Sequence, residues 1–454
     1  MSSIKGSKRV AGAIAILVGN GLLLGACGDT EEVPAPDRLT PRAGSRLKVI
    51  WWQAGEQRRA IGWYDPQLDA ECRFVRVGDE FRCLPEQAEL VYTDASCTQP
   101  LVTDVEGPGW YSLREYGTDY CDPQVSAELI RVGSKVARPT TVFRGSDCSP
   151  TETSQESTYY NLTERTSIDG TVAATLSSQP LDDRMSRDLL TAADGSTEFL
   201  SLFDRELDTY VFSLADSFVP IIGAETTDAY SDASCGVPVG KVVPEYCNVT
   251  FTADSGAQST DRCDSRWQYY RVGPRVTNQV YERTFSGCEA LPTETAEVGE
   301  AIPWEALLVD SRIITGQGRI RARMHASAES GTPLEHDAWY DTRWGTACDH
   351  GIAPDGRARC LPIGFRNVRW TDGRVFMDRE CKVPAVPVDA CGQDIRIAWD
   401  GNSKERYRVT GTRTIDESYE LNAGVCVATK LPREVYSLER IDPSEFVEVK
   451  ELIE

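Results

Sequence analysis

Three histidines are the first candidates for chemistry, because this side chain often acts as an acid–base catalyst or a metal ligand near neutral pH. They are His325, His336 and His350, all in the last third of the chain. None is spaced i, i+4 from another, and the sequence contains neither H-E-x-x-H nor G-x-S-x-G. We therefore expect isolated surface histidines, with no metal site and no His-based triad.

Carboxylates are the second candidates, because the chain holds 70 Asp and Glu residues. They could supply a glycosidase-like acid pair or bind calcium, although no regular D-x-D-x-D-G loop is present. Asp side chains also cap turns by accepting hydrogen bonds from backbone N–H groups. We assign that role to five aspartates that precede cysteines at recurring positions: Asp65, Asp94, Asp232, Asp341 and Asp378. We expect no cofactor.

Six tryptophans could line a sugar-binding face: Trp51, Trp52, Trp63, Trp110, Trp339 and Trp344. Such large side chains more often fill a protein core, and we expect that role here.

The elements that position these residues recur along the chain. The decapeptide VYTDASCTQP at residues 91–100 returns as AYSDASCGVP at 229–238 and more weakly as VFMDRECKVP at 375–384. GWYDPQLDAEC at 62–72 matches AWYDTRWGTAC at 338–348, and each leads into RCLP. RVG occurs twice, each time 17 residues before a cysteine. Self-similarity at a fixed period indicates a repeat architecture.

The repeats divide the chain into predicted parts. Residues 45–158, 159–300 and 301–446 are three units of roughly 140 residues, and 447–454 form a charged tail. Residues 27–44, rich in proline and without apolar periodicity, read as a flexible tether.

Short runs of β-branched and aromatic residues, separated by Gly, Pro, Asp and Ser, predict an all-β fold. The best helical candidate is the single stretch at 182–193. Reiterated antiparallel modules favour a β-propeller closed from the three units, because closure hides strand edges. Three tandem β-sandwich-like domains are the alternative.

Fifteen cysteines in an exported chain imply disulfides. Zinc is disfavoured because there are no close C-x2-C pairs. Unit two lacks the counterparts of Cys72 and Cys83, whereas unit three has both, as Cys348 and Cys360. Two cysteines that are both absent from one unit are expected to be bonded to each other in the units that contain them. We therefore predict the pairs Cys72–Cys83 and Cys348–Cys360.

Without those pairs, units one and three each hold an odd number of cysteines. Free thiols rarely persist in an oxidising compartment. We therefore predict one disulfide that joins units one and three, with Cys148 and Cys426 as one candidate pair.

The N-terminus carries a signal for export. Lys5, Lys8 and Arg9 precede an apolar run from 10 to 26 that is too short to span a bilayer, as in a secretory signal peptide. It ends in LGAC, which matches a bacterial lipobox, so residues 1–26 would be removed and Cys27 lipidated. Gly28 follows where aspartate is the usual inner-membrane retention signal. We predict an outer-membrane lipoprotein, on the periplasmic face or the cell surface.

The chain is acidic, with a formal net charge of −22 that becomes −25 once the three basic residues of the signal peptide are removed. Such a surface repels phosphate backbones, so nucleic acid is not expected as a partner. The expected partners are the membrane, through the lipid, and a glycan or protein ligand.

The lipobox, the Y-x-D-x-x-C-x-x-P anchors, RCLP and RVG together resemble the uncharacterised cysteine-rich lipoproteins of myxobacteria. That resemblance implies no catalytic residue. We therefore expect a non-enzymatic envelope lipoprotein that acts in binding, adhesion or envelope structure. The alternative is a propeller-type carbohydrate-active hydrolase or lyase that uses acidic residues.

Overall fold

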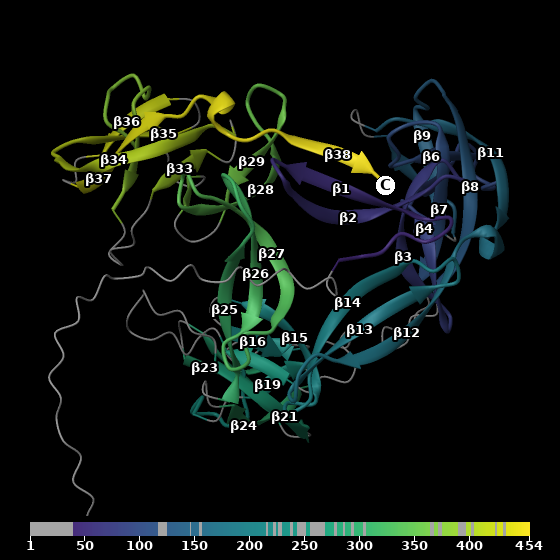
Figure 1. Cartoon of the computed structure of the whole chain (residues 1–454), viewed down its shortest axis with the longest axis horizontal. Coiled ribbons are helices and arrows are strands. Elements are labelled where there is room, and N and C mark those ends of the chain that lie inside the picture. The colour runs from purple at the N-terminus through teal and green to yellow at the C-terminus, as the bar shows by residue number, and fades with distance from the viewer. Residues whose placement is uncertain are drawn as a thin grey trace, which may run out of the picture. The chain divides into compact units, whose positions relative to one another are not determined.

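The structure is a computed structural model of the whole chain (Figure 1). It describes residues 40–454 except 117–124, 146, 154–156, 215–216, 221–223, 226–228, 237–238, 243–250, 255–267, 277–278, 285–286, 292–294, 303–305, 364–366, 371–374, 389–395, 401–403, 423–424 and 430–432. Its described residues form strands, turns and short 3₁₀ turns, without an α-helix. The all-β prediction is confirmed.

Fifteen strands form one antiparallel sheet that draws on three stretches of the chain. The first stretch supplies β1 (Lys48–Ala54), β2 (Gln57–Asp65), β3 (Ala70–Val77) and β4 (Glu80–Pro85). The second supplies β12 (Ala173–Pro180), β13 (Met185–Ala192), β14 (Thr197–Asp204), β15 (Thr209–Leu214) and β16 (Ser217–Pro220). The third supplies β25 (Leu308–Thr315), β26 (Ile320–Ser327), β27 (Pro333–Asp341), β28 (Thr346–Ile352) and β29 (Ala358–Pro362).

The C-terminal strand β38 (Val449–Ile453) completes the first stretch, since it pairs with β1 from Ile50↔Ile453 to Ala54↔Val449. In Figure 1 the yellow β38 lies beside the purple β1. Residues 447–454 are therefore not the charged tail that we expected. They include the strand that corresponds to β12 and β25 in the other two stretches. β38 also meets β29 through an isolated Arg359↔Glu448 bridge.

Each stretch is followed by a smaller set of strands. Seven follow the first: β5 (Glu89–Tyr92), β6 (Pro100–Thr103), β7 (Gly109–Tyr116), β8 (Val125–Lys135), β9 (Thr141–Arg144), β10 (Ser149–Glu152) and β11 (Tyr160–Ser167). After the second come a closed barrel of β17 (Ala224–Glu225), β19 (Val239–Val242), β20 (Phe251–Asp254), β21 (Gln268–Val276) and β24 (Thr295–Ile302), and a sheet of β18 (Ala229–Tyr230), β22 (Val280–Thr284) and β23 (Gly287–Leu291).

The third stretch is followed by an eight-stranded sheet. Its strands are β30 (Asn367–Trp370), β31 (Val375–Phe376), β32 (Pro384–Pro387), β33 (Ile397–Asp400), β34 (Arg406–Ile415), β35 (Ser418–Asn422), β36 (Val425–Thr429) and β37 (Arg433–Arg440). β11 belongs to the seven-stranded sheet and β24 to the closed barrel. These two smaller sheets therefore extend to residues 167 and 302, beyond the unit boundaries that we had placed at 158 and 300.

No closed propeller is found among the described residues. The stretches instead join edge to edge in the large sheet, through β4–β12 and β16–β25 pairing. The stretch 182–193, the best helical candidate, is also not a helix. Its residues 185–192 form β13, which pairs along its length with β12 and β14 and buries both faces. Partners on both sides outweigh the local helix propensity.

One contact occurs three times at the ends of β2, β14 and β27. Each strand ends in an aspartate whose carboxylate is fully buried and binds an arginine 19 to 22 residues earlier: Arg46–Asp65, Arg184–Asp204 and Arg319–Asp341. Each arginine also donates to a backbone carbonyl shortly before the following β12, β25 or β38, at Gly170 (2.8 Å), Ala306 (2.6 Å) and Glu445 (2.7 Å). We call this contact the Arg–Asp–carbonyl clamp. It holds one stretch to the chain that enters the next.

The clamp predicts a large stability cost when its arginine is lost. Arg184→Met would leave the Asp204 carboxylate buried without its cation, which typically destabilises a protein by about 3–5 kcal/mol. Arg58→Met is the matched control, because Arg58 and its partner Glu454 are both roughly half exposed and such pairs contribute less than about 1 kcal/mol. Denaturant unfolding of both variants measures the difference, and equal losses would contradict the structural role of the clamp.

Two disulfides lie in the core of the large sheet. Cys72 is bonded to Cys83 and Cys348 to Cys360, the pairs that their joint absence from unit two predicts. Trp63 stands directly opposite Cys72, and Trp339 opposite Cys348, so each bond packs against a buried indole.

Three further disulfides lie one in each smaller set of strands: Cys97–Cys148, Cys235–Cys288 and Cys381–Cys426. The proposed Cys148–Cys426 bridge is therefore wrong, because each sulfur is already bonded to a cysteine of its own unit. Sequence counting could not show that the first and third cysteine of each trio pair.

The prediction of some disulfide between units one and three now rests on Cys121 and Cys391, which lie outside the described residues, as do Cys247 and Cys263 of unit two. These are the unassigned cysteines after Cys27. The two unassigned cysteines of unit two can pair with each other, so we expect a Cys247–Cys263 disulfide. Units one and three keep one unassigned cysteine each, so we expect a Cys121–Cys391 disulfide between them. Peptide mapping without reductant tests this, and a free thiol at Cys121 would refute it.

Candidate functional site

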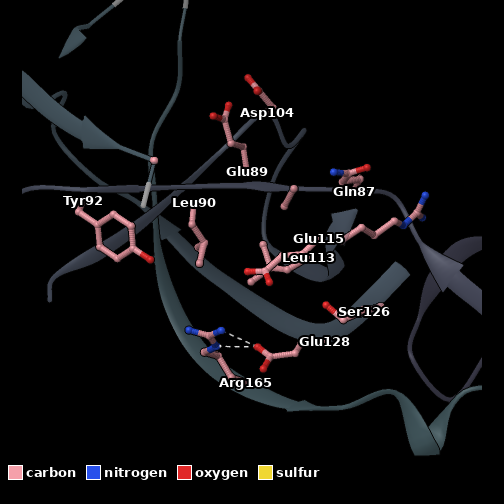
Figure 2. A pocket seen from close by; sticks show the side chains of 14 residues that line it. Gln87, Glu89, Leu90, Tyr92, Asp104, Leu113, Glu115, Ser126, Glu128 and Arg165 are labelled. Atoms are coloured by element: carbon pink, nitrogen blue, oxygen red, sulfur yellow. Dashed lines mark hydrogen bonds and ion pairs between the residues drawn. The ribbon is translucent and has the colours of Figure 1, made fainter. Parts of the chain in front are cut away.

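A pocket of about 1140 Å³ lies on the seven-stranded sheet that follows β4 (Figure 2). Its lining comes from β5, β7, β8 and β11 and from neighbouring turns: Gln87, Ala88, Glu89, Leu90, Tyr92, Asp104, Leu113, Arg114, Glu115, Ser126, Ala127, Glu128, Gly145 and Arg165. The volume is slightly above the range of roughly 300–1,000 Å³ that is typical of pockets for small ligands.

Strand pairing brings these residues together. β5 and β7 are far apart in the order of the sheet, yet the segment before β5 returns to β7 through a Gln87↔Ser112 bridge and an Ala88 N–H bond to the Ser112 carbonyl (2.9 Å). Leu90 and Leu113 consequently pack on the same core cluster. They give the pocket an apolar floor.

Both arginines of the pocket are held by neighbouring groups. Arg165 donates twice to Glu128 Oε2, at 2.9 and 2.5 Å, as the dashed lines in Figure 2 show. Arg114 donates to the Pro85 carbonyl (2.8 Å) and to the Ser112 hydroxyl (3.0 Å).

Two carboxylates lie side by side at the other edge of the pocket, where Figure 2 shows Glu89 next to Asp104. Burial and the hydrogen bond that protonated Glu89 donates to Asp104 raise the pKa of Glu89, although the Arg144 guanidinium, which pairs with Glu89 at 2.5 Å, opposes them. A carboxyl group whose pKa is raised beside a second one is a recognised mark of functional sites. The pair can share a proton or receive a cation.

A second polar cluster surrounds His325, which is buried in β26. Its Nδ1 lies 2.6 Å from Asp310 Oδ2 and 2.9 Å from the Ser213 hydroxyl, and its Nε2 lies 3.4 Å from Asp337 Oδ1. Burial lowers the pKa of His325, but the hydrogen bonds that its ring donates to the Asp310 and Asp337 carboxylates outweigh burial and raise the pKa to about 9. The ring is therefore a cation at neutral pH.

This Ser–His–Asp set cannot work as a catalytic triad. In a triad the serine and the aspartate bind opposite nitrogens of the ring, and the neutral imidazole accepts the serine proton. Here both groups contact Nδ1, and Asp337 occupies the side of Nε2. The cluster is a buried ion network that links β15, β25, β26 and β27.

The network predicts a pH-dependent stability. Because the folded-state pKa of His325, about 9, lies above its unfolded value of 6.5, its contribution is complete below pH 6.5 and is lost as the pH rises to 9. The wild-type unfolding free energy should fall over this range by up to about 3 kcal/mol more than that of His325→Gln. His350→Gln should follow the wild type. Parallel pH profiles for wild type and His325→Gln would contradict the assignment.

The expectation of isolated surface histidines is wrong. His325 is ion-paired and buried, and burial lowers the pKa of His336, whose ring nitrogens are inaccessible to solvent, to about 4. His350 is partly buried and stacks on Trp52 with ring centroids 3.8 Å apart. The strand pairing that creates these environments is long-range, so spacing in the sequence did not reveal it.

The aspartates assigned as turn caps all accept backbone N–H groups. Asp94 bonds Thr98 and Gln99, Asp232 bonds Gly236, and Asp378 bonds Lys382 and Val383, at 2.6 to 3.0 Å. Hydrogen bonds from Ser96 and Thr98 lower the pKa of Asp94. The cysteine of each turn has a φ between 50° and 53°, a left-handed conformation that is uncommon for a residue with a side chain.

Asp65 and Asp341 bond the backbone N–H groups of Gln67 and Arg343, both at 3.0 Å. Their carboxylates also belong to the Arg–Asp–carbonyl clamps. The sequence analysis did not identify the clamp arginines. Arg46, Arg184 and Arg319 each directly precede an apolar residue, in front of or at the start of a strand of the large sheet.

The tryptophans lie mostly in the core. Trp63, Trp339 and Trp344 are buried, whereas Trp51, Trp52 and Trp110 are partly buried. Within the described residues, no group of three or more His, Cys, Asp or Glu is placed to hold a metal ion. No helix in that part of the chain is long and apolar enough to cross a membrane. Cys27 lies outside the described residues.

Residues 22–449 match the model of a family described as "Family of unknown function (DUF7481)". The chain belongs to this family. No curated protein and no solved structure matches the chain.

Sequence reasoning missed the pocket residues of this DUF7481 protein, although one signal could have found them. In the register of the decapeptides, Glu89 and Leu90 correspond to Thr227 and Asp228 in the second copy, and to Gly373 and Arg374 in the third. Positions that differ between copies are where a site specific to one unit would lie. The comparison of the copies does not single out Asp104 and Glu128 in this way, because these residues reach the pocket only through pairing across the sheet.

Proposed function

We propose that this DUF7481 protein is a lipid-anchored outer-membrane lipoprotein that binds a ligand in the pocket of its seven-stranded sheet. The pocket carries the proposal, because it is a concave surface large enough for a ligand, with Leu90 and Leu113 among charged side chains that could orient the ligand. The lipobox and Gly28 support the anchor and its location. The resemblance to myxobacterial cysteine-rich lipoproteins agrees with it. The acidic chain disfavours nucleic acid as the ligand.

We also infer that the body is built from three repeated units. The threefold recurrence of the Arg–Asp–carbonyl clamp and of the Asp-capped cysteine turn supports this inference. The propeller and the three tandem sandwiches remain predictions. The β38–β1 pairing supports closure, because the chain's last strand completes its first stretch.

The lipid anchor predicts a simple change in fractionation. Wild-type protein should separate with outer-membrane markers, and Cys27→Ser should move to the soluble fraction, because one acylated residue is the expected attachment. Cys121→Ser is a control that should leave the fractionation unchanged. Co-fractionation of wild type with inner-membrane markers would contradict the assigned location.

The second candidate is a carbohydrate-active hydrolase or lyase, and the raised pKa of Glu89 beside Asp104 favours it. The geometry is less favourable. Glycosidase carboxyl groups stand about 5–9.5 Å apart so that a sugar carbon or a water fits between them. A hydrogen-bonded pair leaves no such space. The pocket therefore supports binding better than hydrolysis.

We expect no turnover when the full chain is screened against envelope polysaccharides and oligosaccharides with a reducing-sugar assay. Glu89→Gln and Asp104→Asn serve as matched variants, with Glu164→Gln as the control outside the pocket. Turnover that either pocket variant abolishes and the control retains would replace the binding proposal with the enzymatic one.

A further inference from the structure

We propose that the third stretch of the large sheet is joined to the first stretch by an acid-sensitive contact, and that its contact with the second stretch does not share this sensitivity. Acid then releases β28 from β1 and β2, while β26 keeps its contact with β15. The inference comes from where the three histidines lie. It does not involve the pocket, so its failure would leave the proposed binding function untouched.

The first–third joint is a set of contacts between β1 and β2 on one side and β27 and β28 on the other. Arg59 of β2 forms an ion pair with Asp349 of β28 at 2.8 Å. Trp52 of β1 stacks on His350 of β28. The Arg59 guanidinium also lies over the rings of Trp52 and Trp339, 5.7 and 6.0 Å from their centroids. Both indoles belong to one apolar cluster, so polar and apolar contacts together hold the third stretch to the first.

His336 lies in β27, and its environment suits only a neutral ring. Both ring nitrogens are buried, and neither has a hydrogen-bond partner among the described residues. The charged groups that act on the ring are Arg59, Asp337, Asp349 and His325, which include both members of the ion pair at the joint. Burial, and then the Arg59 charge, outweigh the carboxylates and lower the pKa of His336 to about 4. A proton on this ring would be a buried charge without a hydrogen bond, which is costly.

His350 responds to acid in the same direction. Burial lowers its pKa and Arg59 acts in the same sense, whereas the Asp349 and Glu451 carboxylates oppose them. A group whose folded-state pKa lies below its unfolded value stabilises the fold at high pH, and this contribution is lost as the pH falls. For His336 the loss begins near pH 6.5 and is complete near pH 4. Both histidines therefore favour opening of the first–third joint in acid.

The second–third joint contains the remaining histidine and behaves differently. His325 of β26 lies 2.9 Å from the Ser213 hydroxyl of β15 and edge-on to Phe218 of β16, and its ring faces Asp310 and Asp337. The ring is already a cation at neutral pH, so acid adds no proton to it. Burial raises the pKa of Asp337, but hydrogen bonds from His325 and a neighbouring arginine outweigh it and lower the pKa to about 2. The His325–Asp337 pair therefore keeps both charges in mild acid.

The test is hydrogen–deuterium exchange of the full chain, purified in detergent, at about pH 7.5 and about pH 5. The rate of each peptide is divided by its rate in unfolded protein at the same pH, which leaves the protection due to structure. We expect protection of β1, β2 and β28 to fall about thirtyfold at the lower pH. This is the factor by which a group whose pKa rises from about 4 to 6.5 on release favours the open state. Protection of β15 and β26 should not change.

Variants identify the histidine responsible. His336→Leu removes the titrating group and replaces a buried imidazole without hydrogen-bond partners by an apolar side chain, so it should fold and lose most of the acid response. His350→Gln should lose a smaller part. Arg58→Met is the matched control, because Arg58 is next to Arg59 but pairs with Glu454 at the surface, and it should respond to acid as wild type does.

The outcomes distinguish a local joint from general acid unfolding. Equal loss of protection at both joints would overturn the inference, because it would mean that the whole sheet opens together. An undiminished acid response of His336→Leu would overturn it as well, as would unchanged protection of β1, β2 and β28 in acid. Loss of protection that is confined to these three strands and reduced by His336→Leu would support it.

Discussion

The Arg–Asp–carbonyl clamp is the constraint on which the large sheet depends. A carboxylate with no exposed surface, such as that of Asp204, requires a cation and hydrogen bonds to its remaining lone pairs. Arg184 supplies the charge, and the backbone N–H groups of Glu206 and Leu207 supply the other bonds. Because the same guanidinium also binds the Ala306 carbonyl, the end of β14 and the start of β25 cannot move independently.

The clamps leave the strands that follow each stretch less constrained by the large sheet. Those strands are instead held by the Asp-capped cysteine turns and by one disulfide in each set. The three sets accordingly differ in topology: a single seven-stranded sheet, a closed barrel with a three-stranded sheet, and an eight-stranded sheet. The clamp therefore occurs in the same form three times while the sets of strands that follow it differ, and the pocket lies in one of these sets.

Local chemistry in the sequence predicted the parts of this structure that depend on neighbouring residues. The strands, the capping role of Asp94 and the Cys72–Cys83 bond all follow from residues close together in the chain. Features that depend on distant pairing were missed or misread. β13 looked helical because its two neighbouring strands were unknown, and His325 looked exposed because Asp310 and Ser213 reach it from other strands. The candidate site belongs to the second class, since the segment before β5 meets β7 through the Gln87↔Ser112 bridge between residues distant in the chain.

The two polar clusters show why one is a candidate site and the other is part of the framework. Around His325 a buried cation faces two carboxylates and a hydroxyl, and these contacts link four strands of the large sheet. In the pocket Arg165 is paired with Glu128, whereas Arg114 is bonded only to neutral groups and Glu115 is exposed. This difference in accessible charge, and not the number of acidic residues, is why we place the proposed ligand in the pocket.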